Sequence, residues 1–404
     1  MFHTNRRIFF AGFLLFGLIL LFSQCMQKKR AGTDPRGSAF AGAAACARCH
    51  KDIHTSYLDA AHNKTSAIAS KSAIGGSFAA PHNEYVYRPG VKVAMEERDS
   101  ALYQVAYSQG QEQQASRFDI VVGSGRKAQT FLYWYDDKVF QLPVSYFVPA
   151  HSWANSPNYP PRQVRFDRNI PIGCFECHSS YIKRTTMEPA GEFYIDHFDR
   201  QKIVYGIDCE RCHGPAARHV DYHEEHPQEK QAKFIKTYAS LSRQMKLDGC
   251  AVCHSGLQAT RRSTFAFRPG DTLANRFFPP AAPVNVADID VHGNQYQLLT
   301  ASQCFIKSKT MDCATCHDPH VKERDNLAAF SQRCMTCHSE AAHNFCKMAP
   351  ALGASITQNC IDCHMPARPS KLITLLSNGQ ASPTPNKVRT HYISVYPETS
   401  PRSH

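Results

Sequence analysis

Residues 209–213 are Cys-Glu-Arg-Cys-His, one copy of a Cys-x-x-Cys-His pattern that the chain repeats seven times. The seven copies use fourteen of its 17 cysteines. A shuffled chain of the same composition would contain roughly 0.04 copies of this pattern, so chance does not explain it. The cysteine pairs are Cys46/Cys49, Cys174/Cys177, Cys209/Cys212, Cys250/Cys253, Cys313/Cys316, Cys334/Cys337 and Cys360/Cys363. The histidines that follow them are His50, His178, His213, His254, His317, His338 and His364.

The chemistry of this pattern is that of covalent c-type haem attachment. Two thiols on one helical turn match the two vinyl groups of a haem, and the next residue directs an imidazole at the iron. Zinc also uses paired Cys-x-x-Cys units, but it does not require a histidine after every pair. A thioredoxin-like dithiol would need one motif in a βαβ context, not seven. The sequence therefore predicts seven c-type haems held by fourteen cysteines, with the seven motif histidines as proximal iron ligands.

The formal net charge of +12 could suggest nucleic acid or an acidic membrane as a partner. Each haem, however, carries two propionates, and seven haems would nearly cancel this charge. The chain also has no long run of like charges. We therefore interpret the excess of lysine and arginine as propionate partners and expect no nucleic-acid binding.

The N-terminus predicts export. Arg6-Arg7 precedes an apolar run over residues 8–22, which is signal-like and short for a spanning helix of ~20 residues. The run ends in Ser23-Gln24-Cys25, which resembles a bacterial lipoprotein signal except at Gln24, where a small residue is expected. An uncleaved anchor or an ordinary signal with an incidental cysteine are the alternatives. We expect a signal over residues 1–25, a flexible tether over 26–42, and a periplasmic or outer-membrane-associated protein anchored through Cys25 or an N-terminal helix.

Residues 83–150 contain no cysteine and differ in pattern from the rest. Short runs rich in Val, Tyr and Phe at 85–87, 91–95, 102–107, 118–122, 130–135 and 138–142 are separated by turn signals. Gly123-Ser124-Gly125 is one of these, and a hairpin turn explains it better than an anion-binding loop. We predict a first haem unit over 43–82, a β-rich insert over 83–150, a six-haem cytochrome domain over 151–395 and a tail over 396–404. The predicted fold is a multihaem cytochrome c, mainly α-helical and irregular around a haem stack, with an inserted antiparallel β-meander.

The second axial ligand decides between a carrier and a catalyst, because an iron with both axial positions filled has no site for a substrate. Twelve histidines remain after the proximal and terminal ones are excluded, which is enough to close all seven irons. They are His54, His62, His82, His151, His197, His219, His223, His226, His292, His320, His343 and His391.

Several segments resemble a known family. Residues 46–50 with His62 in Ala-Ala-His-Asn-Lys-Thr are similar to the first haem unit of cytochrome c-554-type multihaem proteins, which belong to the superfamily of hydroxylamine oxidoreductase and multihaem nitrite reductases. Residues 206–215 with His219-Val220 are similar to the family's second signature. Residues 313–320 and 360–366 also resemble that group.

The resemblance implies distal ligand roles for four histidines and leaves three to complete the set. His62, His219 and His320 take the distal role by their place in the matching segments, as does His391 in Arg389-Thr390-His391. His82, His292 and His343 complete seven. The chain departs from the catalytic members in two respects. It has no Cys-x-x-Cys-Lys motif, which the nitrite reductases use at the active haem, and it has seven motifs where hydroxylamine oxidoreductases bind eight haems. Both departures disfavour an enzyme.

Cys304 and Cys346 lie outside the motifs. In an oxidising compartment they could form a disulfide that braces the fifth and sixth haem units, or remain buried free thiols. We favour the disulfide.

Three functions fit these observations. The leading one is extracytoplasmic electron transfer through seven haems, between a quinol-oxidising complex or other redox proteins and a terminal acceptor at the membrane surface. The alternative is a haem-dependent oxidoreductase that acts on a small nitrogen or sulfur compound at one open haem. The third is a scaffold subunit that uses the β-rich insert as a docking surface.

Overall fold

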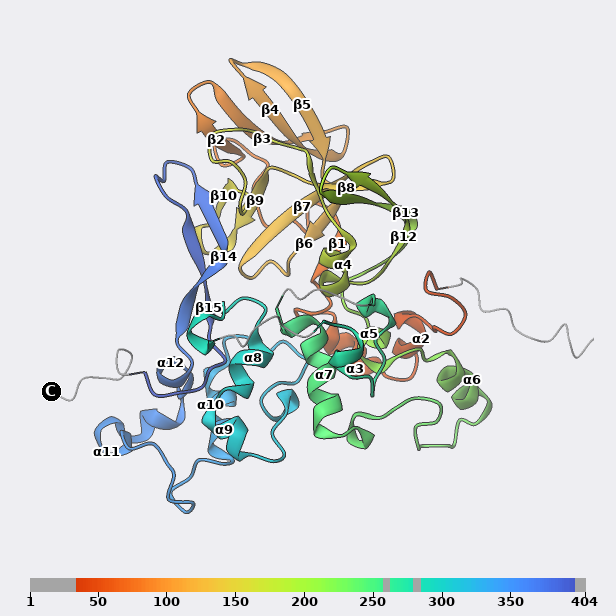
Figure 1. The fold of residues 1–404 in the computed structure, drawn as a ribbon, viewed down its shortest axis with the longest axis vertical. Helices are drawn as coiled ribbons and strands as arrows, with labels where there is room; N and C mark the ends of the chain where they lie inside the picture. Colours follow the sequence, from red (N-terminus) through yellow and green to blue (C-terminus); the bar gives the residue numbers. More distant parts are fainter. Residues whose placement is uncertain (1–33, 257–261, 279–284, 397–404) are drawn as a thin grey trace, which may run out of the picture.

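The computed structural model describes residues 34–256, 262–278 and 285–396. The β-sheets gather at one end of the molecule, and the short helices lie at the other end (Figure 1). Helix accounts for 27% of the structure and strand for about 28%. The prediction of a mainly α-helical protein is therefore wrong, because long strands also form outside residues 83–150. In the described part of the chain the strands form three sheets, of nine, four and two strands.

The four-stranded sheet is an antiparallel meander of consecutive strands. Tyr85, Tyr87, Val93 and Met95 of its first two strands are buried on one face, as strand alternation requires. The strands are β2 (Glu84–Arg88), β3 (Val91–Arg98), β4 (Ala101–Ser108) and β5 (Gln111–Arg117).

The nine-stranded sheet combines segments from the whole chain. Its strands are β1 (Ser66–Ile68), β6 (Ile120–Val122), β7 (Ala128–Tyr135), β8 (Lys138–Gln141), β9 (Val144–Phe147), β10 (Ser152–Asn155), β11 (Arg168–Asn169), β14 (Ala367–Ser377) and β15 (Thr384–Arg389). Each of the six strands predicted within residues 83–150 has a counterpart, but they divide between these two sheets. Gly123, with a φ of 109°, lies in the turn between the antiparallel strands β6 and β7. A Cβ there would lie 2.5 Å from the Ala128 carbonyl oxygen, which explains the glycine.

Two long hairpins connect the motif-bearing end to the sheets. The hairpin of β12 (Ser179–Ala190) and β13 (Phe193–Tyr205) starts directly after the second motif and ends just before the third. The β14–β15 hairpin starts three residues after the seventh motif, and Ala154 of β10 pairs with Ser377 of β14. Both hairpins leave the helical end and reach the sheets (Figure 1).

The helices are short. The α-helices are α2 (Ala43–Ala47), α3 (Lys51–Tyr57), α4 (Ile172–His178), α5 (Cys209–His213), α6 (Ala217–Glu225), α7 (Arg243–His254), α8 (Gln295–Thr300), α9 (Gln303–Lys307), α10 (Leu327–Met335), α11 (Ala349–Leu352) and α12 (Ile361–His364). The 3₁₀ turns are η1 (Val148–Ala150), η2 (Tyr238–Ser240), η3 (Thr264–Ala266), η4 (Leu273–Asn275), η5 (Val286–Asp288), η6 (Cys313–Thr315) and η7 (Gly353–Thr357). None of the described helices is long and apolar enough to cross a bilayer, and the N-terminal segment with Cys25 lies outside the described residues.

The main apolar core belongs to the β-rich end. Trp153 is 2% exposed, and its ring contacts Phe78, Phe118, Phe131 and Tyr146 at centroid distances of 5.4–6.3 Å. A second cluster between the nine-stranded sheet and the β12–β13 hairpin includes Phe175 of the second motif. The largest cluster at the motif-bearing end has only three fully buried members, Val252, Phe267 and Phe277.

Candidate haem sites

Each motif folds as a short helical turn. The second, third, fourth and seventh motifs place their histidines at the ends of α4, α5, α7 and α12. In the others the histidine N–H donates to the carbonyl of the first cysteine, as from His50 to Cys46 at 2.9 Å and from His317 to Cys313 at 3.0 Å. This bond places the first thiol and the imidazole on one face of the turn. None of the fourteen motif cysteines takes part in a disulfide in the structure.

The first motif departs from an enclosed attachment site at Cys49. This predicted haem-binding cysteine is exposed in the structure, whereas Cys46 is half-buried and lies close to Cys209. Among the described residues, no side-chain contact joins the Cys49 thiol to another motif. The reason is local, because α2 ends at Ala47 and Cys49 lies in the turn that follows, where its N–H donates to the Cys46 carbonyl at 3.2 Å. The role of Cys49 in haem attachment therefore stays a prediction that rests on the motif spacing alone. The other exposed motif cysteines are Cys174, Cys212 and Cys337.

The third motif is built by its flanking residues. Asp208 caps α5, because its carboxylate accepts a hydrogen bond from the Arg211 N–H at 2.9 Å. Gly206 has a φ of 63°, and a Cβ there would collide with the Asn63 carbonyl oxygen. The Ile207 N–H donates to the His62 carbonyl at 2.9 Å. The loop that carries His62 is therefore fixed against the third motif.

Among the described residues, three pairs of imidazoles bring a motif histidine opposite a predicted distal histidine. The ring centroids of His62 and His254 are 6.0 Å apart, those of His213 and His320 are 6.0 Å apart, and those of His317 and His391 are 6.1 Å apart. The first pair of rings is nearly perpendicular, at 88°, whereas the other two are inclined by 17° and 29°. In each pair the partners come from distant parts of the sequence.

These separations fit a metal ion bound between the rings. Metal–nitrogen bonds of about 2.0 Å on both sides, plus about 1.1 Å from each nitrogen to its ring centre, place two axial imidazole centroids about 6 Å apart. Burial, with neighbouring imidazoles, lowers the pKa of His62 and of His391 to about 4. Neutral imidazole is the form that binds a metal. The buried Nδ1 atom of His391 has no hydrogen-bond partner among the described residues.

His292, another predicted ligand, lies in the neighbourhood of the second motif. Burial, together with His292 and His254, lowers the pKa of His178 to about 4. The His178 carbonyl accepts hydrogen bonds from Thr65 Oγ1 at 2.9 Å and Ser66 Oγ at 2.7 Å. The second motif is thus held against β1.

The remaining predicted distal ligands differ in their surroundings. His219 lies in α6, which is held beside the first motif by an ion pair of 2.7 Å between Arg48 and Glu224. His343 is exposed, five residues after the sixth motif. His82 is exposed and lies two residues before β2, a strand of the β-rich end (Figure 1). In the described structure no contact joins His82 or His343 to a motif histidine.

Several histidines have a hydrogen-bond partner at Nδ1 that leaves Nε2 free. The Nδ1 atoms of His254, His338 and His364 contact Gln295 Oε1 at 3.1 Å, the Asn344 carbonyl at 3.2 Å and the Ser394 carbonyl at 2.9 Å. The Nδ1 atom of His219 contacts the Lys233 carbonyl at 2.9 Å. Metal-binding histidines are typically oriented in this way. Sequence reasoning missed these partners, because backbone carbonyls carry no sequence signal and Gln295 lies 41 residues from its histidine.

Contacts between cysteines of different motifs show which motifs are neighbours in the folded chain. The thiols lie close together in the pairs Cys46 and Cys209, Cys177 and Cys253, Cys250 and Cys313, and Cys334 and Cys360. These pairs join the first motif to the third, the second to the fourth, the fourth to the fifth and the sixth to the seventh.

Further contacts connect the motifs that the cysteine pairs leave separate. His320, three residues after the fifth motif, faces His213 of the third. Arg333 Nη1 donates to the Cys316 carbonyl at 2.7 Å and so joins the sixth motif to the fifth. All seven motifs therefore belong to one connected group, as the positions of α2, α4, α5, α7, α10 and α12 also indicate (Figure 1).

The disulfide favoured by the sequence does not form in the structure. Cys304 and Cys346 are both free. Cys304 lies near Cys316 and Cys337 of the fifth and sixth motifs, and Cys346 lies near Cys363 of the seventh. The two thiols therefore lie beside different motifs.

Of two hollows in the described structure, one adjoins a candidate haem ligand and the other does not. A hollow of about 510 Å³ adjoins His391, because Thr390 and Tyr392 line it together with apolar Val291 and Leu298 and the basic side chain of Lys371. A mostly apolar lining with a cation suits a porphyrin edge and its propionate. A second hollow, of about 570 Å³, lies on the four-stranded sheet and contains no motif residue.

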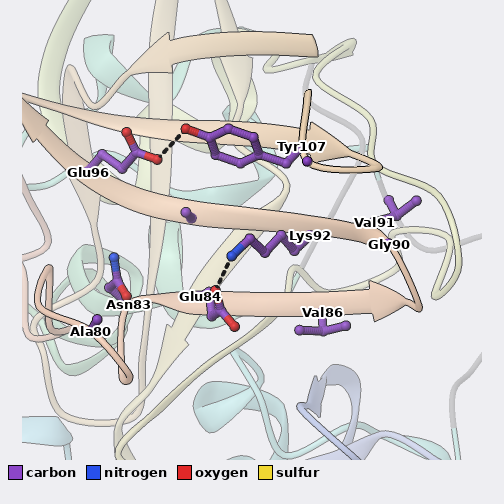
Figure 2. Close-up of a pocket in the computed structure, with 11 residues that line it drawn as sticks. Ala80, Asn83, Glu84, Val86, Gly90, Val91, Lys92, Glu96 and Tyr107 are labelled. Atoms are coloured by element: carbon purple, nitrogen blue, oxygen red, sulfur yellow. Dashed lines mark hydrogen bonds and ion pairs between the residues drawn. The ribbon is translucent and has the colours of Figure 1, made fainter. Parts of the chain in front are cut away.

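Figure 2 shows the hollow on the four-stranded sheet. Lys92 pairs with Glu84 at 2.6 Å, and the Tyr107 hydroxyl donates to Glu96 at 2.7 Å. Its charged groups are thus already paired. No group of three or more His, Cys, Asp or Glu side chains within the described ranges is arranged to hold a bare metal ion.

Comparisons with known proteins agree with these motifs. No protein-family model matches the chain. The multiheme cytochrome MtrA of Shewanella baltica (strain OS185) is 26% identical over 205 residues, which are 46% of this chain and 56% of that protein. The chain thus spans about half the length of this curated relative. The crystal structure of the outer cell wall cytochrome OcwA matches with a TM-score of 0.51 over 88% of this chain and 79% of that one, at 15% identity. The two chains share a fold.

Proposed function

We propose that this chain, a multihaem c-type cytochrome, transfers electrons outside the cytoplasm through seven covalently attached haems. The observation that carries the proposal is the set of three opposed imidazole pairs, His62–His254, His213–His320 and His317–His391, at 6.0–6.1 Å. An iron held between two imidazoles is closed to substrates and serves electron transfer.

The contacts between motifs support a continuous path. The first motif contacts the third, the third faces the fifth, and the fifth continues to the sixth and seventh. The fourth motif adjoins the fifth, and the second adjoins the fourth. When bound, the haems supply one-electron chemistry. The chain's own contribution is to hold neighbouring attachment sites side by side and to present the imidazoles.

The proposed distal ligands are His62, His82, His219, His292, His320, His343 and His391. The ring pairs support His62, His320 and His391, and the neighbourhood of the first and second motifs supports His219 and His292. Membership of the cytochrome c-554-type family is part of the same proposal and is supported by residues 206–220 and 313–320.

Spectroscopy of the purified full-length protein tests this proposal. Mass spectrometry should find seven attached haems; the oxidised protein should be low-spin and unreactive with cyanide and nitrite, and the reduced protein should not bind CO. The EPR spectrum should contain two kinds of low-spin signal, because the rings of His62 and His254 are nearly perpendicular and those of the other two pairs are not. Replacing His62 with alanine should remove the signal of the perpendicular pair. Fewer than seven haems, or a protein that is high-spin throughout, would contradict the proposal.

One observation favours a second candidate, an oxidoreductase with an open haem. Among the described residues, no second imidazole contacts the ring of His338 or His364. The two predicted ligands left for these motifs are His343, which is exposed, and His82, which lies beside β2. A high-spin signal and CO binding by about one haem in seven, both abolished when the seventh motif is removed, would support this candidate. A fully low-spin protein would exclude it.

The proposal also includes the location and the partners. We place the protein at the membrane surface, attached through Cys25, where it exchanges electrons with a quinol-oxidising complex or other redox proteins. The support is the charged start, the apolar run and the position of Cys25 in the sequence. A Cys25→Ala variant should move from the membrane fraction to the soluble fraction with all haems retained. Unchanged membrane association would contradict lipid attachment.

A further inference from the structure

The described chain begins with a segment that lies on the third motif. Arg36 extends between carboxylates, and its side chain is only 5% exposed. Its Nη1 and Nη2 atoms donate to the two oxygens of Asp208 at 2.9 and 2.6 Å, and Nη2 also contacts Glu210 at 3.1 Å. Its Nε atom pairs with Asp34 at 2.8 Å. Such two-pronged contacts are the strongest form of ion pair.

The carboxylates that Arg36 contacts belong to the third motif. Asp208 precedes Cys209 and caps α5. Glu210, which lies between the two cysteines, is 2% exposed and accepts hydrogen bonds from the N–H groups of Ala41, Gly42 and Ala216 at 2.8–2.9 Å. Two acidic side chains are thus buried at the attachment turn, more than 165 residues from the arginine in sequence.

Arg211, the other arginine of this region, does not form an ion pair with these carboxylates. Arg211, inside the motif, donates instead to the carbonyls of Thr264 and Glu176 at 2.9 and 3.0 Å. Among the described residues, Arg36 is the basic side chain that forms ion pairs with both Asp208 and Glu210. Buried charges left without a partner are strongly unfavourable, so the turn depends on this residue.

We propose that Arg36 is a positioning residue of the third haem site, and that its positive charge raises the reduction potential of that haem by offsetting part of the negative charge of Asp208 and Glu210. The inference rests on the proposed function. Reduction adds an electron to the iron, and unpaired carboxylates beside it would oppose that step. Charge and hydrogen bonding near a haem are among the means by which a protein adjusts its potential.

Redox titration of the full-length holoprotein tests the inference through charge changes of opposite sign. Arg36→Gln should shift one of the seven redox components to lower potential. Glu210→Gln should shift one component to higher potential, because Arg36 then faces one carboxylate fewer. The double variant should return close to the wild type, and Arg36→Lys should restore most of the potential. The same component should be altered in a His320→Ala variant, which would assign it to the third haem.

A matched control is Arg98→Gln. Arg98 pairs with Glu96 and Glu112, both at 2.8 Å, but lies in the four-stranded sheet away from the motifs. This variant should leave the titration unchanged.

Several outcomes would overturn the inference. Shifts of Arg36→Gln and Glu210→Gln in the same direction would indicate general loosening instead of charge compensation. A wild-type titration of Arg36→Gln with seven haems would also contradict it. If Arg36→Gln does not mature, Glu210→Gln and Arg36→Lys decide the sign. Absence of haem from the wild type would instead refute the proposed function.

Discussion

The two ends of the molecule are stabilised in different ways. At the β-rich end, fifteen buried side chains, from Ile74 to Phe166, form one cluster around the Trp153 ring. At the motif-bearing end the described helices have few buried residues, and α2, α3, α9 and α11 have none. Burial of apolar surface is the main stabilising contribution to a fold. The β-rich end therefore carries its own core, whereas under the proposed function the haems would supply the apolar contacts of the motif-bearing end.

The two ends nevertheless share backbone. The β12–β13 hairpin starts at the second motif, and the β14–β15 hairpin starts beside the seventh. Beside β8, His197 of β13 contacts Asp137 at 2.8 Å, and Lys138 pairs with Glu188 of β12 at 2.9 Å. The hairpins thus offer a route by which order at one end supports the other.

Among the predicted changes, removal of the haems should have the largest effect on the difference in stability between the two ends. A variant with all fourteen motif cysteines replaced by serine should lose amide protection in α4, α5, α7, α10 and α12, because their apolar partners would be absent. Strands β2–β10 should stay protected. Hydrogen exchange followed by mass spectrometry measures both regions in one experiment.

The matched control for haem removal is the double variant Cys304→Ser and Cys346→Ser. Both thiols are free in the structure and lie outside the motifs. Its protection pattern should equal that of the wild type. Protected motif helices in the haem-free variant would show that the motif-bearing end has a sufficient core of its own.

The difference between the ends also explains what the sequence could predict. Alternating apolar residues mark β2, β3, β4, β6, β7 and β8, so these strands were predictable. Strand β5, Gln111–Arg117, is almost entirely exposed and polar, and only its pairing with β4 makes it a strand. The β12–β13 and β14–β15 hairpins were missed for a related reason. Strand β12 has a long exposed stretch, and β14 and β15 mix exposed, half-buried and buried positions without a regular alternation. Both hairpins are ordered by the pairing of their strands.

Some residues of the candidate sites were likewise predictable from local sequence, and others depend on tertiary structure. The cysteines and the proximal histidines follow from local spacing, since attachment needs one helical turn. Which histidine faces which motif depends on tertiary structure: His317 and His391 are 74 residues apart and meet only in the folded chain. Arg36 could not be predicted, because its partners Asp208 and Glu210 lie far away in sequence.

An intermediate effect is expected from Trp153→Ala. The ring is 2% exposed, and its Nε1 donates to the Ser77 carbonyl at 2.9 Å. Loss of such a side chain costs about 3–5 kcal/mol of unfolding free energy. Denaturant unfolding followed by circular dichroism should show this loss, while the haem spectra stay unchanged.

The other tryptophan provides the comparison. Trp134 is only partly buried and lies beneath Arg200 at 5.0 Å. Trp134→Ala should therefore cost clearly less than Trp153→Ala. Equal losses would mean that the cluster around Trp153 is not the principal core.

The smallest effect is expected where the β14–β15 hairpin meets the four-stranded sheet. Asn378 lies directly after β14; its Oδ1 accepts from the Val86 N–H at 2.7 Å and its Nδ2 donates to the Glu84 carbonyl at 2.9 Å. The side chain thereby occupies hydrogen-bonding positions on the edge strand β2, where an unpaired strand would invite association. Asn378→Ala should cost about 1 kcal/mol and speed exchange of the Val86 amide. Asn378→Asp retains the acceptor for that amide and loses only the donor, so it should keep Val86 protected.

The same pair of variants tests whether the two ends are coupled. If the hairpin transmits order from the sheet to the seventh motif, Asn378→Ala should also speed amide exchange in α12 (Ile361–His364), and Asn378→Asp should do so less. If exchange changes only at Val86, the ends are joined covalently but are independent in stability. Arg389 at the end of β15 donates to the Met365 carbonyl at 3.3 Å, so a change in α12 could arrive along either strand of the β14–β15 hairpin. Exchange in α12 therefore measures how far the sheets support the motif-bearing end.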